Sequence, residues 1–111
     1  MPDSYIAVAD ILMDIEKELR ELGLWESEPP SAEALASTQP FAIDTLTFSQ
    51  WLQFVFIPGM YRLVENRDAL PASCHIAPMG EEYFRLQPQL NSATLVAHLH
   101  RIDRLLTRKD G

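Results

Sequence analysis

Cysteine is nearly absent from this chain of 111 residues, and glycine is scarce. Cys74 is the single cysteine, so no disulfide can form within the chain and an oxidising compartment is not implied. The four glycines are scattered along the sequence. This scatter excludes the glycine-rich loop that cradles phosphate groups in many nucleotide-binding proteins.

Positive charge is also scarce. Sixteen Asp and Glu residues outnumber nine Lys and Arg residues, which gives a net charge of −7. Proteins that bind nucleic acid use Lys and Arg to neutralise phosphates, and anionic membrane surfaces attract cations in the same way. We therefore expect no direct binding of this chain to nucleic acid or to a membrane, and an acidic surface suited to a basic partner.

Long hydrophobic runs are missing. The longest apolar stretch lies around Trp51 to Met60; it is interrupted by Gln53 and is too short to span a bilayer. The first residues, MPDSYIAVADILMDIE, are acidic and amphipathic, unlike the basic and then apolar order of a secretory signal peptide. These features predict a cytoplasmic protein, and they leave its oligomeric state open.

The residues that carry chemistry form no recognisable catalytic or metal-binding pattern. Cys74 and His75 are adjacent, whereas His98 and His100 are two residues apart and therefore do not share a helical face. Neither spacing matches a zinc site. A nucleophilic thiol would also need an oriented base and oxyanion donors, and no glycine-rich turn surrounds Cys74. We predict no metal, no cofactor and no enzymatic activity.

Helical periodicity is what the chain has in abundance. Apolar side chains repeat at spacings of three and four over residues 4–22, which predicts an amphipathic helix. Asp3 or Ser4 can cap the start of this helix. Gly23 can adopt the left-handed conformation that ends it.

A central helix is predicted near residues 47–66. Thr47 and Gln50 form a capping box, Thr-x-x-Gln, at its start. Apolar residues surround most of this helix, which predicts burial on nearly all sides. Pro58 removes a backbone donor in the middle of the helix, at a cost of about 3 kcal/mol in an exposed helix. We therefore expect a kink or a break at Ile57–Gly59 that leaves a carbonyl group unpaired.

Two more helices complete the prediction. A short one is expected near 80–87, where Pro88 stops it, and a longer one near 92–107. Arg108 and Lys109 would lie near the negative end of the last helix. Because no β-alternation occurs, we predict an all-α fold, a compact small bundle with up-down connections, formed by one domain over residues 1–111. It would contain three substantial helices and one short helix.

The segment 37–60 and the residues just after it are the candidate functional site. Individually, the large aromatic side chains of this segment are interpreted as core. The segment as a whole is interpreted as the lining of a pocket or an interface, with a few polar groups that orient a ligand. The candidate binding residues are Gln39, Asp44, Trp51, Gln53, Phe54, Pro58 and Arg62.

Several motifs in and after this segment resemble the YqcC-like family of small bacterial proteins. They are Ser37-Thr38-Gln39-Pro40-Phe41, Asp44-Thr45, Trp51-Leu52-Gln53, Ile57-Pro58 with Met60, and Ala77-Pro78. The resemblance runs over nearly the whole chain. It implies a compact all-α bundle and, through gene context, tRNA pseudouridine synthase C as a partner. The family usually has Arg at the position of Gly59, and Arg62 is the nearby residue that can substitute for it.

Two functions from different classes remain open. The first is a non-enzymatic accessory or interaction protein associated with tRNA pseudouridine synthesis, with a tRNA pseudouridine synthase as its protein partner. The alternative is a small-molecule binding domain with an apolar pocket near Trp51 and Pro58.

Overall fold

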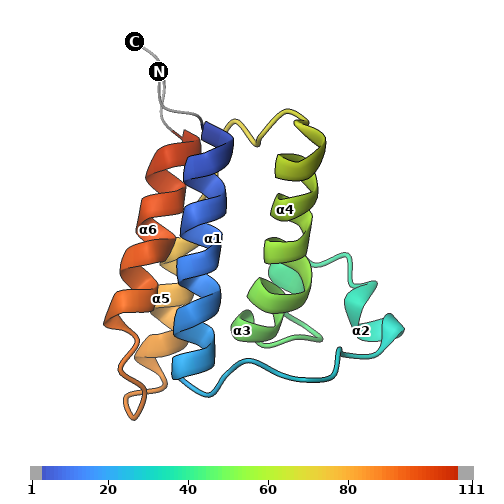
Figure 1. Ribbon diagram of the computed structural model, residues 1–111. Helices are drawn as coiled ribbons and strands as arrows, with labels where there is room; N and C mark the ends of the chain where they lie inside the picture. Colours follow the sequence, from blue (N-terminus) through green and yellow to red (C-terminus); the bar gives the residue numbers. More distant parts are fainter. Residues whose placement is uncertain (1–3, 108–111) are drawn as a thin grey trace.

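A computed structural model describes residues 4–107 of the chain, and every regular element in this range is helical (Figure 1). Asp3, Arg108 and Lys109, which we expected at helix ends, lie outside the described residues. In chain order the elements are α1 (Ser4–Glu21), α2 (Ala32–Leu35), the 3₁₀ turn η1 (Pro40–Ala42), α3 (Phe48–Trp51), the π-helical turn η2 (Leu52–Phe56), α4 (Ile57–Asn66), α5 (Ala77–Arg85) and α6 (Ala93–Thr107).

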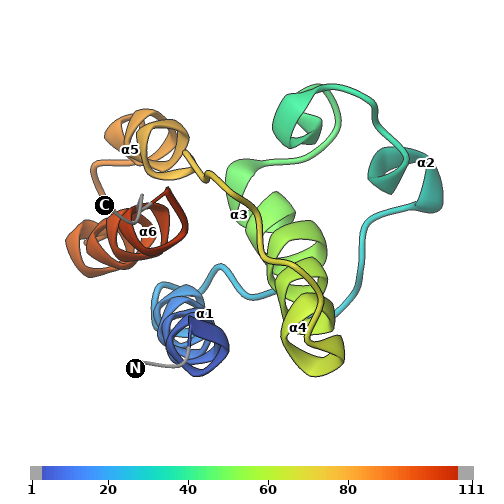
Figure 2. The ribbon, with the colours of Figure 1, turned by 90° about the horizontal axis from the view of Figure 1, so that it is seen from above.

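The helices run alternately down and up, which confirms the predicted all-α bundle (Figure 1). Seen from above, α1, α5 and α6 stand together, while α3 and α4 form the other side and α2 lies beyond them (Figure 2). The chain between α4 and α5 crosses over the top of the bundle. No helix within residues 4–107 combines the length and the apolar character needed to cross a membrane.

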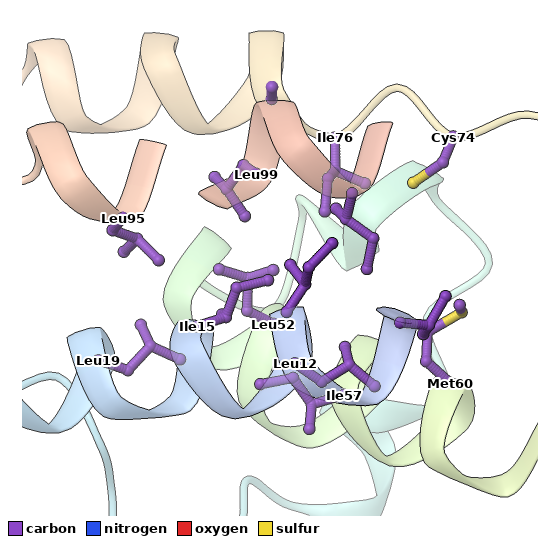
Figure 3. Packing of buried hydrophobic residues seen from close by; sticks show 14 of the residues in the cluster. Leu12, Ile15, Leu19, Leu52, Ile57, Met60, Cys74, Ile76, Leu95 and Leu99 are labelled. Atoms are coloured by element: carbon purple, nitrogen blue, oxygen red, sulfur yellow. The ribbon is translucent and has the colours of Figure 1, made fainter. Parts of the chain in front are cut away.

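The first helix follows its sequence pattern closely. Leu12, Ile15 and Leu19 are fully buried, and they pack with residues of α6 and of the central helix in one core (Figure 3). Gly23 has φ +74°. Its N–H donates to the carbonyl of Arg20 at 3.1 Å, and a left-handed residue at the end of a helix costs least when it is glycine.

The capping box of the central helix is also confirmed. The Thr47 hydroxyl accepts a hydrogen bond from the Gln50 N–H at 3.1 Å, and the Gln50 side-chain oxygen accepts one from the Thr47 N–H at 2.9 Å. These two bonds satisfy N–H groups that have no partner inside the helix. The helix therefore begins where the sequence predicted.

The irregularity in this helix lies one turn earlier than expected, so the prediction of a break at Ile57–Gly59 is wrong. Ile57 is helical, with φ −61° and ψ −49°, and its N–H bonds to the carbonyl of Leu52, five residues back. In a regular α-helix the ring of Pro58 would crowd a carbonyl in the preceding turn. The wider π turn shifts that carbonyl, so the chain passes through Pro58 without leaving the helix.

The prediction that this helix is buried on nearly all sides is wrong as well. Leu52, Ile57 and Met60 are buried, but Val55 is 37% exposed and Pro58 is also exposed. The reason is the arrangement of the bundle: α4 packs against α1, α3 contacts α5, and the remaining face of the helix meets η1 and the connector before α5 within the described residues.

Helix α5 begins at Ala77, three residues before the expected start. Pro78 occupies its first turn, where a missing N–H costs nothing, so this proline is well suited to the start of the helix. Asp103 of α6 accepts the N–H groups of Ile76 and Ala77 at 2.9 and 2.8 Å. A carboxylate is well suited to this place, because the N-terminus of a helix is its positive end.

Candidate binding groove

An open groove of about 690 Å³ lies beside the π turn, and we call it the Trp51 groove. Its volume is within the range of roughly 300–1,000 Å³ that is usual for ligand pockets. Three segments form its walls: η1, the outer face of the central helix, and the connector before α5. The lining residues are Phe41, Trp51, Val55, Phe56, Gly59, Met60, Leu63, Pro71, Ser73, Cys74, His75 and Ile76.

The helical wall of the groove depends on the π turn. Trp51 precedes this turn, Val55 and Phe56 belong to it, and Leu63 follows two turns later. The extra residue in a π turn rotates the side chains before it relative to those after it. As a result, two adjacent residues, Val55 and Phe56, both contribute to one wall.

Phe41 forms the end of the groove and adopts an unusual backbone conformation. Phe41 and Ala42 have φ angles of +57° and +49°, a region that residues other than glycine seldom occupy. The ring of Phe41 lies 4.8 Å from that of Trp51 in an edge-to-face arrangement, and Trp51 stacks on Phe56 at 5.3 Å. Packing among these rings offsets the strain of the turn, since aromatic pairs contribute about 0.5–1.5 kcal/mol each.

A second, smaller hollow also has Phe41 in its lining. It measures about 170 Å³, and we call it the Leu86 hollow. Leu86 and Ile43 are among the most exposed large apolar side chains of the described residues, at 68% and 61%. The residues that line this hollow are Phe41, Ile43, Phe48, Met79, Glu82, Tyr83 and Leu86.

The connector that closes the groove is held to α6 by Thr107. The Cys74 N–H donates to the Thr107 hydroxyl at 2.9 Å, and that hydroxyl donates to the Cys74 carbonyl at 3.0 Å. Figure 3 shows Cys74 near Ile76 and Met60 at one end of the core cluster. The floor of the groove is therefore part of the core.

The Cys74 thiol lies at this floor in a protonated state. Burial, together with a hydrogen bond from the thiol to Asp103 and the negative charge of that residue, raises the pKa of Cys74 to about 12. Because the thiolate is the reactive form, a thiol with such a pKa is a poor nucleophile at neutral pH. Among residues 4–107, no group of three or more His, Cys, Asp and Glu side chains is placed to hold a metal ion.

The structure brings one of the seven predicted binding residues, Trp51, into the groove lining. Pro58 and Arg62 are exposed on α4 next to lining residues, and Phe54 is half-buried. Gln39 is exposed before η1, and Asp44 accepts a hydrogen bond from the Ser37 hydroxyl.

Gln53 has a different environment from the other six. It is buried, and its carboxamide bonds to the backbone of Glu26 and not to the groove. Gln53 therefore does not belong to the surface that lines the Trp51 groove.

Sequence reasoning missed most of the lining. Phe41 and Phe56 were interpreted as core, although both are half-buried groove residues. The connector residues Pro71 to Ile76 carry no periodic pattern that could place them against the central helix. Their position follows from Thr107 and Asp103, more than 25 residues further along the chain.

Comparisons with known proteins place this architecture in a family. The model of the family DUF446, described as "tRNA pseudouridine synthase C", matches residues 7–105. An uncharacterized protein from Escherichia coli (strain K12), YqcC, is 37% identical over 95 residues, which are 85% of each chain. The chain belongs to the YqcC-like family. The solution NMR structure of the YqcC protein from E. coli superimposes with a TM-score of 0.82 at 33% identity, and covers 97% of this chain and 92% of that one.

Two further relatives differ in how much of their own length this chain matches. An uncharacterized protein from Haemophilus influenzae is 45% identical over 71 residues, which are 64% of this chain and 67% of the relative. A protein named tRNA pseudouridine synthase C, from Pectobacterium carotovorum subsp. carotovorum, is 47% identical over 66 residues. These are 60% of this chain but 18% of that relative, so this member of the comparison is a much longer protein.

Proposed function

We propose that this chain is a non-enzymatic accessory protein that binds a tRNA pseudouridine synthase C. The observation that carries the proposal is the Pectobacterium relative: a protein with the synthase name contains a segment 47% identical to this chain. Two domains in one polypeptide meet at a high effective concentration. Where the same domains are separate chains, an interface between them is needed to keep them together.

The Trp51 groove offers a surface for such an interface. Its lining is dominated by aromatic and aliphatic side chains and includes Trp51, Phe56 and Met60. Aromatic residues and Met are enriched at the buried centres of protein interfaces, and Trp is prominent among residues that contribute most to binding. The open shape suits a protein segment that covers the groove from outside.

The chemistry of the described residues supports a binding role over a catalytic one. Cys74, the one thiol, has a pKa raised to about 12 and is therefore not activated. The net charge of −7 disfavours direct binding of tRNA by this chain. We assign tRNA contact to the synthase and place the complex in the cytoplasm.

The test is a binding measurement with two purified proteins, this chain and the tRNA pseudouridine synthase C of the same bacterium. We expect co-elution in size-exclusion chromatography and a calorimetric Kd of about 1 μM or below. A gel-shift assay of this chain with tRNA alone is the control, and it should show no binding. Absence of any complex at low salt and at about 100 μM of each protein would contradict the proposal.

A small molecule in the Trp51 groove is the second candidate, because the groove volume of about 690 Å³ is large enough for one. The open shape is less favourable for it, since typical pockets bury about 70–90% of a ligand's surface. A ligand that binds only the folded state raises the melting temperature. A metabolite screen that produces such a rise in the native chain, and a smaller one in Trp51→Ala, would favour this function.

A further inference from the structure

The chain segment that supplies Phe41, Trp51, Val55 and Phe56 to the Trp51 groove has negative charge and no positive charge. Residues 21–61 contain no Lys, Arg or His. The same stretch contains five carboxylates, which are Glu21, Glu26, Glu28, Glu33 and Asp44. Within the described residues, the ion pairs found join side chains outside this stretch. Glu33 and Asp44, which lie further along the stretch, take part in none of these ion pairs and can meet cations from another molecule.

At the start of the stretch, Arg20 lies 4.4 Å from the centre of the Trp25 ring, and Lys17 and Arg20 line the same small hollow as Glu21. Further along, the nearest cations do not cancel the charge. Arg62 follows the stretch directly, but it is exposed on α4 and does not line the groove. His75 lines the groove from the opposite wall. Arg85 is paired with Glu82, the carboxylate that lines the Leu86 hollow. The uncompensated charge thus belongs to Glu33 of α2 and to Asp44, which follows η1.

Apolar surface is present at the same place, in two parts. Phe41 lines both the Trp51 groove and the Leu86 hollow, so the two apolar sites adjoin at this residue. Val55 is exposed in the first, and Ile43 and Leu86 are exposed in the second. An amphipathic helix places apolar side chains one or two turns apart on one face, and such a helix can put one anchor in each of the two sites.

We propose that the Trp51 groove and the Leu86 hollow together bind a basic amphipathic helix. The apolar face of that helix fills the two sites, and its Lys and Arg side chains meet the carboxylates of Glu33 and Asp44. The assignment of the helix to the tRNA pseudouridine synthase C rests on the proposed function. The chemistry of the occupant rests on the charge and shape of this surface alone.

Two synthetic helical peptides test the chemistry of the occupant, one of Leu and Lys and one of Leu and Glu with the same length and apolar pattern. Fluorescence anisotropy with the full chain should show binding of the Leu/Lys peptide and none of the Leu/Glu peptide. Raising the salt from about 0.1 M to about 1 M shortens the Debye length from about 10 to about 3 Å and should weaken binding at least about tenfold. Equal binding of the two peptides would overturn the proposal.

A matched pair of variants tests the location. Val55→Arg places a charge in the groove, whereas Met13→Arg makes the same change at a 61% exposed position on α1, outside the groove lining. Both variants change the net charge equally. Val55→Arg should weaken binding of the Leu/Lys peptide at least about tenfold, and Met13→Arg less than about twofold. Equal losses in the two variants would show non-specific attraction and overturn the proposal.

The double variant Glu33→Gln/Asp44→Asn tests the carboxylates. It keeps the size of both side chains and removes two charges, so binding of the Leu/Lys peptide should weaken several-fold and depend less on salt. An unchanged salt dependence would contradict the role of these carboxylates.

The synthase, used in place of the peptides, separates this inference from the proposed function. If the Leu/Lys peptide binds as expected and the synthase does not bind, the proposed function fails and the chemistry of the occupant stands. If the synthase binds the native chain and Val55→Arg with equal affinity, the proposed function stands and the groove is not its binding site.

Discussion

The side chain of Gln53 holds the backbone of Glu26 by both of its polar atoms. Its oxygen accepts the Glu26 N–H at 2.9 Å, and its nitrogen donates to the Glu26 carbonyl at 2.7 Å. The two residues are 27 positions apart, and Gln53 is only 6% exposed. This pair fixes the chain after α1 against the π turn, and it gives Gln53 a structural role.

Gln53→Ala should therefore lower the free energy of unfolding by about 2–3 kcal/mol, because two hydrogen bonds are lost and backbone groups are left without partners. Urea unfolding followed by circular dichroism measures the change. Gln89→Ala is the control: Gln89 is exposed and bonds only to the side chain of Gln87 among the described residues, so the effect should stay within about 0.5 kcal/mol. Equal stabilities of the two variants would contradict a structural role for Gln53.

Gly80 and Gly59 should respond in opposite ways to alanine. A Cβ atom at Gly80 would lie 2.5 Å from the Leu99 side chain and 3.1 Å from Phe48, whereas a Cβ atom at Gly59 meets nothing within 4 Å. Overpacking costs about 1–3 kcal/mol, and alanine gains up to about 1 kcal/mol over glycine in a helix. We expect Gly80→Ala to lose about 1–2 kcal/mol and Gly59→Ala to gain up to about 1 kcal/mol in urea unfolding. A gain in both would mean that α5 can move away from α6 without cost.

The Cys74 thiol predicts a loss of stability at alkaline pH. Its ordinary pKa is 9.0, which applies to the unfolded chain, and folding raises it to about 12. Between these two values the unfolded chain has lost the proton that the folded chain keeps, so the free energy of unfolding falls as the pH rises. The contribution is fully present below pH 9.0.

The measurement compares the native chain with Cys74→Ala, which lacks the titrating group. Between about pH 8 and about pH 11, the unfolding free energy of the native chain should fall relative to that of the variant. Alkylation by iodoacetamide near neutral pH should also be slow for the folded chain and fast in urea. A pH-independent difference, or fast alkylation of the folded chain, would refute the raised pKa.

Pro58→Ala should keep the helix and change binding. The new N–H at position 58 can donate to a carbonyl in the preceding turn, which removes a reason for the π turn over Leu52–Phe56. Val55 and Phe56 then shift relative to Trp51, so the affinity for the synthase should fall at least about fivefold while far-ultraviolet circular dichroism is unchanged. An unchanged Kd would leave Pro58 with a purely structural role.

Much of the fold was predictable from local patterns. The capping box of Thr47 and Gln50, the left-handed Gly23 and the apolar stripe of α1 all depend on residues within one or two helical turns of each other. Interactions over such short separations are encoded directly in the sequence. The π turn was not predictable. The sequence showed that Pro58 disturbs a regular helix, but not whether the chain responds with a kink, a break or a π turn.

The candidate site was predictable only in part, for a similar reason. Trp51 was identified because aromatic residues cluster around it, but the opposite wall comes from the connector before α5. That wall is positioned by Asp103 and Thr107 of α6. A contact between residues so far apart in the sequence produces no repeating pattern of apolar residues in either segment.

The sequence by itself determined that this chain is an acidic bundle of helices, because apolar spacing, capping residues and charge balance act locally or in sum. Only the tertiary structure decided which face of the central helix stays open. Helices α1 and α5 contact the central helix, and Leu52, Ile57 and Met60 are buried in the core that these helices share. Among residues 4–107, the face with Val55 meets only η1 and the connector before α5, so the apolar side chains around it form a groove and not a core.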